Sequence, residues 1–329
     1  MNHLRLEKPA FMLDGAGRGH KLIIEILIFL LVFIIGSNII SVIIFIPEMV
    51  HIFTNGEIIT SAQDFLMRGD FVGYLQMILD VVSNLPVWLT WLNMFATIAM
   101  IGTVLVYCCK INKRSLSNLG LVKKGAAREY CVGFVLGAAF IGVSVLICCL
   151  TGSMRIASNT DVSFGWLAAF LLAFLVQGFS EELTCRGYLM PAIARRNKLW
   201  VGVLVSSVLF ALGHILNSGL TLLAFFNLFL FALFAALYTI ARGSLWGIAA
   251  LHSAWNFFQG NIFGIEVSGI NVSATAAKCT PVPGRELLNG GAFGLEGGLA
   301  VTAVLVLGIA VEILCLWKKQ SQKKLPAES

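Results

Sequence analysis

Charged residues are scarce in this chain of 329 residues. Asp, Glu, Lys and Arg make up 12% of the sequence, apolar residues make up 58%, and the mean hydropathy is +0.88. This balance excludes an ordinary soluble domain, in which about 25% of the residues are charged. Apolar runs of about 20 residues, the length that crosses a bilayer as a helix, recur along nearly the whole chain. The sequence therefore predicts an all-α, polytopic membrane protein with a single domain over residues 1–329.

Cysteine patterns that hold a metal or a disulfide are also absent. Seven of the 8 cysteines lie in or beside apolar runs, where cysteine behaves as a small hydrophobic residue, and only Cys279 falls in a long polar loop. The sequence contains no Cys-x-x-Cys spacing and no His-Glu-x-x-His zinc-protease motif. We therefore expect no external disulfide, and no metal site follows from a motif alone.

Eight apolar spans are expected, with boundaries good to a few residues. They cover residues 22–46, 84–108, 130–151, 164–186, 200–216, 220–241, 244–262 and 297–317. The segment 47–83 is too charged to span a membrane, so it is expected at the surface or at the interface. The loop 263–296 is rich in Gly, Ser and Thr and contains two prolines, so it is expected to be the least ordered part.

The positive residues fall mainly on one side of these spans. That side receives nineteen of the 23 Lys and Arg residues, although Arg186 lies inside its span. The other side holds only Arg68, Arg155, Lys278 and Arg285. Short basic clusters between apolar runs encode membrane topology, so the net charge of +6 does not indicate a nucleic-acid partner. The bias predicts that both termini are cytoplasmic, and the first span is expected to be retained because no signal-peptide cleavage site follows it.

A few polar residues interrupt the apolar spans. Glu181, Glu182 and Arg186 follow the run 164–178, which has no charged residue, and His214 and His252 are the two histidines inside spans. An ionisable residue at bilayer depth costs roughly 2.5–3.5 kcal/mol on insertion scales, so it is a candidate for a functional site. One such histidine is often only a helix–helix hydrogen-bonding residue. Two histidines together with a pair of glutamates make that interpretation weaker.

Helix geometry places these residues at a similar depth. At 1.5 Å per residue, Glu181 lies ~21 Å from the basic cluster at residues 195–196, and His214 lies about 24 Å beyond Lys198. His252 and Asn256 lie about 15 and 21 Å beyond Arg242. All four therefore fall in one layer of a ~30 Å hydrocarbon core.

Spacing along each helix suggests which side chains pair with one another and which are left free for chemistry. Glu182 and Arg186 are four residues apart, share a helix face and can pair. Glu181 is rotated about 100° away and is left free for chemistry. His252 and Asn256 are also four residues apart and can point toward one place. A buried carboxylate, imidazoles and an amide suit hydrolysis, since the carboxylate can take a proton from water and an amide N–H can stabilise an oxyanion.

These motifs resemble the CPBP family, which comprises the type II CAAX prenyl endopeptidases and the bacterial Abi, or bacteriocin-processing, proteins. The family pattern is Glu-Glu-x-x-x-Arg, then Phe-x-x-x-His, then His-x-x-x-Asn or Asp, on successive membrane helices. The chain matches it in order and spacing with Glu181-Glu182 and Arg186, then Phe210 and His214, then His252 and Asn256, over residues 166–264. The resemblance divides the domain into N-terminal spans without a signature (1–163), a catalytic core (164–264), and an external loop, last span and basic cytoplasmic tail (265–329).

The resemblance implies an intramembrane endopeptidase whose substrate is a peptide or protein in or at the membrane. Glu181 would be the general base on water, His214 would help to hold that water, and His252 and Asn256 would bind the developing oxyanion. Glu182 and Arg186 would be supporting residues. A divalent metal such as zinc, held by Glu181, His214 and His252, is the alternative left open. The short loops favour the Abi branch and a bacterial cell membrane.

Two further functions are weighed against the protease. One is a non-catalytic membrane scaffold or bacteriocin immunity protein that keeps the motif for packing. The other is a small transporter that uses Glu181 and the histidines as a proton relay. Activity of a Glu181→Gln variant separates the protease from the scaffold, and substrate or proton flux in vesicles would indicate a transporter.

Overall fold

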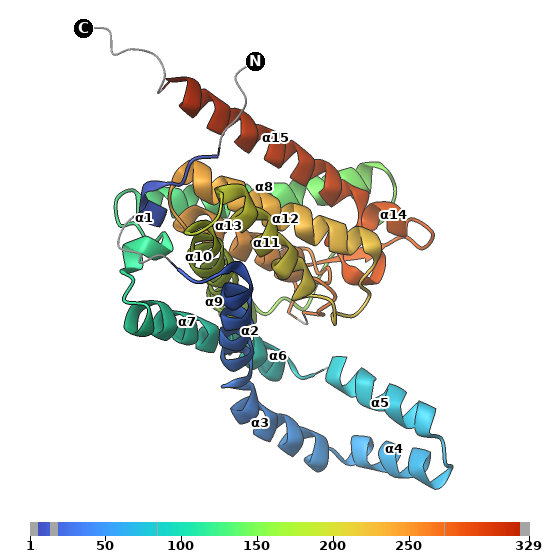
Figure 1. Cartoon of the computed structure of the whole chain (residues 1–329). Helices are drawn as coiled ribbons and strands as arrows, with labels where there is room; N and C mark the ends of the chain where they lie inside the picture. The colour runs from blue at the N-terminus through green and yellow to red at the C-terminus, as the bar shows by residue number, and fades with distance from the viewer. Residues whose placement is uncertain (1–5, 14–18, 84, 273, 323–329) are drawn as a thin grey trace, which may run out of the picture.

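The computed structural model describes residues 6–13, 19–83, 85–272 and 274–322. Helices dominate these residues (Figure 1), which confirms the predicted all-α membrane fold. The N-terminal half contains α1 (Ala10–Leu13), α2 (Leu22–Asn38), α3 (Ser41–Thr54), α4 (Gly56–Met67), α5 (Phe71–Ser83), α6 (Val87–Phe95), α7 (Ile98–Leu105) and α8 (Ala126–Leu150). The C-terminal half contains α9 (Phe164–Glu182), α10 (Met190–Ala194), α11 (Leu199–Leu212), α12 (Leu222–Arg242), α13 (Trp246–Phe257), α14 (Glu286–Asn289) and α15 (Leu299–Gln322).

Six helical stretches within the described residues are long and apolar enough to cross a membrane. They are Leu22–Thr54, Val87–Ile111, Ala126–Leu150, Phe164–Ala194, Leu222–Arg242 and Leu299–Gln322. The other two predicted spans are shorter helices, α11 and α13. A π-helical turn, Phe258–Ile262, extends α13, and every residue of α13 from Gly247 onward is buried by neighbouring helices.

The cytoplasmic placement of the termini stays a prediction. Four of the basic residues that support it, Arg5, Arg18, Lys323 and Lys324, lie outside the described residues.

Helix α13 lies at the centre of the C-terminal half and packs closely against α8 and α9. Two glycines permit this approach. A Cβ on Gly133 of α8 would lie 1.8 Å from the Gly247 carbonyl oxygen, and a Cβ on Gly178 of α9 would lie 2.6 Å from Ser253 Oγ. Small residues bring helix backbones together in membrane proteins. The Gly178 contact sets the end of α9 directly against the middle of α13.

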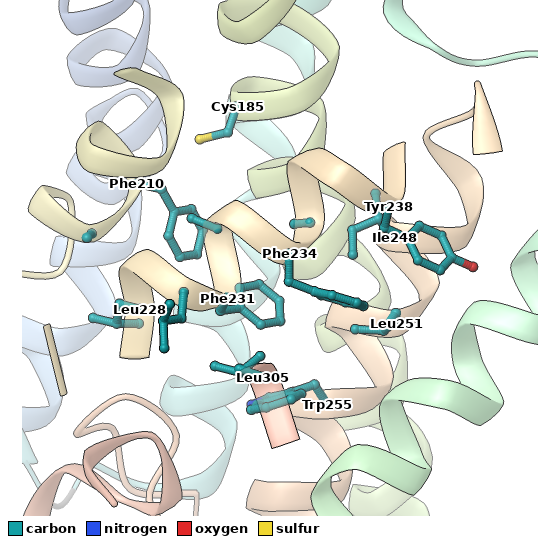
Figure 2. Close-up of a cluster of buried hydrophobic side chains, with 14 of the residues drawn as sticks. Cys185, Phe210, Leu228, Phe231, Phe234, Tyr238, Ile248, Leu251, Trp255 and Leu305 are labelled. Atoms are coloured by element: carbon teal, nitrogen blue, oxygen red, sulfur yellow. The ribbon is translucent and has the colours of Figure 1, made fainter. Parts of the chain in front are cut away.

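An aromatic and aliphatic cluster fills the space between α11, α12, α13 and α15 (Figure 2). Phe210, Phe231, Phe234, Trp255 and Leu305 contribute to it, and each is at least 94% buried. The rings of Phe231 and Trp255 are 5.3 Å apart in an edge-to-face arrangement, a preferred geometry for aromatic pairs. This cluster fixes α12 against the helices that carry the predicted site residues.

Residues 56–83 of the charged segment form an arm, while residues 47–54 belong to α3, which continues the first long apolar stretch. Helix α3 leads away from the helical body, and α4 and α5 form a hairpin beyond it (Figure 1). No residue of α4 is buried. Helix α4 therefore takes no part in the packed interior, whereas Glu48 of α3 accepts from Asn93 Nδ2 of α6 over 2.6 Å.

The expectation that the loop 263–296 is poorly ordered is wrong. Strand β2 (Ala277–Pro281) pairs antiparallel with β1 (Met154–Ser158), with Ile156 opposite Cys279. Several buried residues follow, including Phe293 and Leu295. The glycines form sharp turns: Gly264, Gly269, Gly284, Gly290, Gly291 and Gly294 all have positive φ angles. Glycine reaches such angles without steric cost, so its abundance here reflects a tightly folded loop.

Candidate active site

A wide helical turn positions the two adjacent glutamates. Helix α9 continues through a π-helical turn, Leu183–Leu189, into α10, so the helix runs from Phe164 to Ala194. The helix thus extends beyond the expected span 164–186, to within one residue of the basic cluster from which the depth of Glu181 is measured. Single π-helical turns within α-helices are frequent at functional sites. The glutamates lie where this turn begins, and Arg186 lies within it.

Glu182 and Arg186 form the pair that their spacing predicts. Arg186 Nη1 donates to Glu182 Oε1 over 3.0 Å, and both side chains have no exposed surface. Arg186 Nη2 donates to the Ala232 carbonyl oxygen over 3.0 Å, and Arg186 Cζ lies 4.7 Å from the centroid of the Phe210 ring. The guanidinium is thus held by a carboxylate, a backbone carbonyl and an aromatic face.

His252 connects the two glutamates. Its Nδ1 lies 2.9 Å from Glu182 Oε1, and its Nε2 lies 3.7 Å from Glu181 Oε2. The Phe231 ring, 4.8 Å away between centroids, packs edge-to-face against the imidazole. Glu182 Oε1 also accepts from Arg186, so it is the natural acceptor for His252 Nδ1–H, and Nε2 then faces Glu181. Glu182 therefore has a definite task that spacing alone does not reveal: it orients His252.

Gln177 joins the site, and the sequence analysis missed it. Gln177 Nε2 donates to Glu181 Oε1, and Gln177 Oε1 accepts from Asn256 Nδ2 over 2.9 Å. One amide therefore connects the carboxylate on α9 to the amide on α13. The signal was available, because Gln177 is a polar residue inside an apolar run, four residues before Glu181. A search for charged residues passes over it.

His214 lies in a turn and not within a helix, which corrects its expected place in the span 200–216. Helix α11 ends at Leu212 with Gly213 at its C-cap, and the turn continues toward Gly219, whose φ is +73°. His214 is half-buried, and its Nδ1 lies 2.9 Å from the Phe210 carbonyl oxygen. The helix ends at its C-cap Gly213, before the turn signal at residues 217–219.

One cavity of about 1290 Å³ brings the predicted residues together. Glu181, His214, His252 and Asn256 line it, as does Gln177. Glu182 and Arg186 lie behind this lining and do not form part of it. Other parts of the chain complete the wall: residues of α2, residues of α6 and α7, the segment 266–271, and Glu296. The motif residues thus share a space with segments that carry no motif.

The proposed metal ligands are not gathered as a metal site. Among the described residues, no three side chains of His, Cys, Asp or Glu lie close enough together to hold a metal ion. Glu181, His214 and His252 in this arrangement therefore do not fit a zinc site, which needs at least three converging protein ligands.

The comparison with protein families gives a match for the part of the chain that carries the motifs. Residues 163–258 match the family model described as type II CAAX prenyl endopeptidase, Rce1-like. The matched segment begins just before α9, ends just after α13, and contains all of the predicted site residues. The match confirms the resemblance at the level of the family, over less than a third of the chain. Comparison with curated proteins and with solved structures gave no match.

Proposed function

We propose that this integral membrane protein is an endopeptidase that hydrolyses a peptide bond of a membrane-associated peptide or protein. The observation that supports this most is the meeting of Glu181, His214, His252 and Asn256 at one cavity, within the segment that matches a protease family. A cavity of this size accommodates an extended peptide segment. The description of the family model names the CAAX endopeptidases, so an Abi-type role remains a prediction.

Glu181 is assigned as the general base. Its side chain is 28% exposed at the cavity wall, and Oε2, itself a buried atom, has no hydrogen-bond partner among the described residues, so this oxygen is assigned to the water. In the first step, Glu181 takes a proton from this water while the water oxygen forms a bond to the carbonyl carbon of the substrate. In the second step, the carbon–nitrogen bond breaks, and Glu181 returns the proton to the departing nitrogen. His214, on the same cavity wall, is assigned to hold the water.

Asn256 and His252 are assigned to the oxyanion that forms between these steps. Asn256 Nδ2 carries two protons, of which Gln177 Oε1 takes one, so the second is left for the substrate oxygen. His252 donates from Nε2 when both ring nitrogens carry a proton, and Nδ1–H then stays with Glu182. Donors aimed at the oxyanion stabilise the transition state more than the ground state.

Glu182, Arg186 and Gln177 are assigned as positioning residues. Glu182 accepts from His252 Nδ1 and thereby sets the direction of Nε2. Arg186 balances the buried charge of Glu182, and Gln177 holds Glu181 and Asn256 in register across two helices. None of these residues forms or breaks a bond in the reaction, and no step runs through a metal.

The experiment uses the full chain reconstituted in phosphatidylethanolamine–phosphatidylglycerol vesicles with a library of synthetic membrane-anchored peptides. New peptide termini are detected by mass spectrometry. Glu181→Gln and His214→Ala should abolish cleavage, and Asn256→Ala should lower the rate by about 10²–10³-fold, as loss of one oxyanion donor does. Glu57→Gln, which changes an exposed glutamate of α4, is the matched control and should cleave like the wild type.

Two outcomes would contradict the proposal. Cleavage by Glu181→Gln at the wild-type rate would remove the assigned base. Absence of any cleavage by the wild type, together with proton or solute flux that depends on Glu181 in the same vesicles, would instead support the transporter.

A further inference from the structure

Glu296 is a buried carboxylate on the cavity wall that the proposed reaction does not use. It lies in a short turn just before α15, beyond the segment that matches the protease family, and is 94% buried. Its two oxygens accept from different segments: Oε1 from Ser268 Oγ over 3.2 Å, and Oε2 from Gln259 Nε2. Within the described residues, no Lys, Arg or His lies within ion-pair distance of it.

One side of this network leads to the helix that carries His252 and Asn256. Gln259 lies in the π-helical turn that continues α13, one turn beyond Asn256. Its Nε2 also donates to the Glu266 carbonyl oxygen over 2.6 Å. The amide is therefore fixed by two acceptors, and Glu296 holds the end of this helix through it.

The other side leads to the turn that carries His214. The Ser268 carbonyl oxygen accepts from Asn217 Nδ2 over 2.8 Å, and the Asn217 backbone N–H donates to the His214 carbonyl oxygen over 3.0 Å. The two segments also touch through their backbones. A Cβ on Gly269, whose φ is +81°, would lie 2.1 Å from the Ser218 carbonyl oxygen.

We propose that Glu296 is a positioning residue that holds the His214 turn against the helix bearing His252 and Asn256. The inference rests on the proposed function. Because α11 ends at Leu212, His214 keeps its contact with the Phe210 carbonyl oxygen, but the turn beyond it takes its position from the segment 266–271 through Asn217 and Ser218. An apolar side chain would be cheaper to bury than a carboxylate that has only neutral donors. The carboxylate accepts two hydrogen bonds from different segments, which an apolar side chain cannot do. It therefore links the two segments.

The test compares two substitutions at Glu296 in the reconstituted full chain. Glu296→Leu removes both acceptors and should lower the single-turnover rate by about 10²-fold, the loss that a misplacement of about 1 Å can cause. Glu296→Gln should restore most of this rate, because its amide oxygen can accept from Gln259 while its amide N–H donates to Ser268 Oγ. Glu296→Leu protein that cleaves at the wild-type rate would overturn the inference.

A second comparison covers the case in which Glu296→Leu fails to fold. Gly269→Ala and Gly284→Ala both place a Cβ on a glycine with φ near +80°, but Gly284 has no atom within 4 Å of that position. The two variants share the backbone strain and differ in the contact with the His214 turn. Gly269→Ala should lower the turnover rate at saturating peptide with little change in KM, and Gly284→Ala should not. Equal rates for the two variants would overturn the inference.

The same assays distinguish this inference from the proposed function. Glu181→Gln is measured beside the other variants. If Glu181→Gln is inactive and the Glu296 and Gly269 variants are fully active, only the positioning role fails. If Glu181→Gln is active, the proposed function fails.

Discussion

Two polar networks line the same cavity, and they differ in their charges. The network on α9 and α13 contains Glu181, Glu182, Arg186 and His252, which exchange charged contacts at 2.9–3.7 Å. The network around Glu296 contains one carboxylate and otherwise neutral partners. The first has groups that can move a proton and the second has none beyond Glu296 itself. A buried polar cluster can therefore take part in a reaction or can hold other residues in position. The partners of its carboxylates, charged or neutral, distinguish the two cases.

The two networks also differ in how the sequence reveals them. The residues of the first lie at helical spacings in apolar runs, so they stand out in a linear reading. The second joins residues of four separate segments, 217, 259, 268 and 296, which have no common spacing. The four predictions below test this comparison from the strongest expected effect to the weakest.

Breaking the Glu182–Arg186 pair should have the largest effect on stability. Arg186→Ala leaves the buried carboxylate of Glu182 without its counter-charge, a change that costs roughly 3–5 kcal/mol. We expect a lower thermal midpoint, a lower yield and a loss of cleavage, since Glu182 also orients His252. The thermal midpoint in detergent measures this. An Arg186→Ala protein as stable as the wild type would show that the pair does not stabilise the fold.

Removing the Gln177 bridge should lower activity with little effect on folding. A hydrogen bond to a charged group contributes about 1.5–3 kcal/mol, so Gln177→Leu should lower kcat by roughly 10–100-fold. Gln177→Glu keeps the acceptor for Asn256 but cannot donate to Glu181, so it isolates one half of the bridge. Gln76→Leu, on the arm, is the control. An unchanged kcat in Gln177→Leu would remove Gln177 from the site.

The second network predicts a pH dependence of stability. Burial raises the pKa of the Glu296 carboxyl above its unfolded value of about 4.3. Its contribution to stability is therefore fully present below about pH 4.3 and is lost as the pH rises through the raised pKa. As the pH rises, the thermal midpoint of the wild type should fall relative to that of Glu296→Gln. If the difference between the two thermal midpoints does not change with pH, the pKa of the Glu296 carboxyl is not raised by burial. Glu57→Gln is the control.

Metal removal should have the smallest effect. Because Glu181, His214 and His252 do not converge as ligands in this structure, a strong chelator should leave the cleavage rate of the purified full chain unchanged. Activity that is lost to the chelator and restored by zinc would show that the site rearranges into a metal centre.

Much of the fold, and the meeting of the predicted residues at one cavity, follow from the sequence because bilayer length and helical spacing are local rules. Examples are the apolar helix that carries the two glutamates, the Glu182–Arg186 pair, and the exposed position of α4. The position of His214, the role of Gln177 and the folded loop after residue 263 did not follow. Each depends on contacts between distant segments: Asn217 with Ser268, Gln177 with Asn256, and β1 with β2. Such contacts leave no periodic signal in the sequence.

The most direct test of the central claim is single-turnover cleavage in water enriched in ¹⁸O. The account predicts that wild-type protein places one solvent oxygen in the new carboxylate of the product, and that Glu181→Gln forms no product. Product without solvent oxygen, or product formed by Glu181→Gln at the wild-type rate, would contradict hydrolysis with Glu181 as the base.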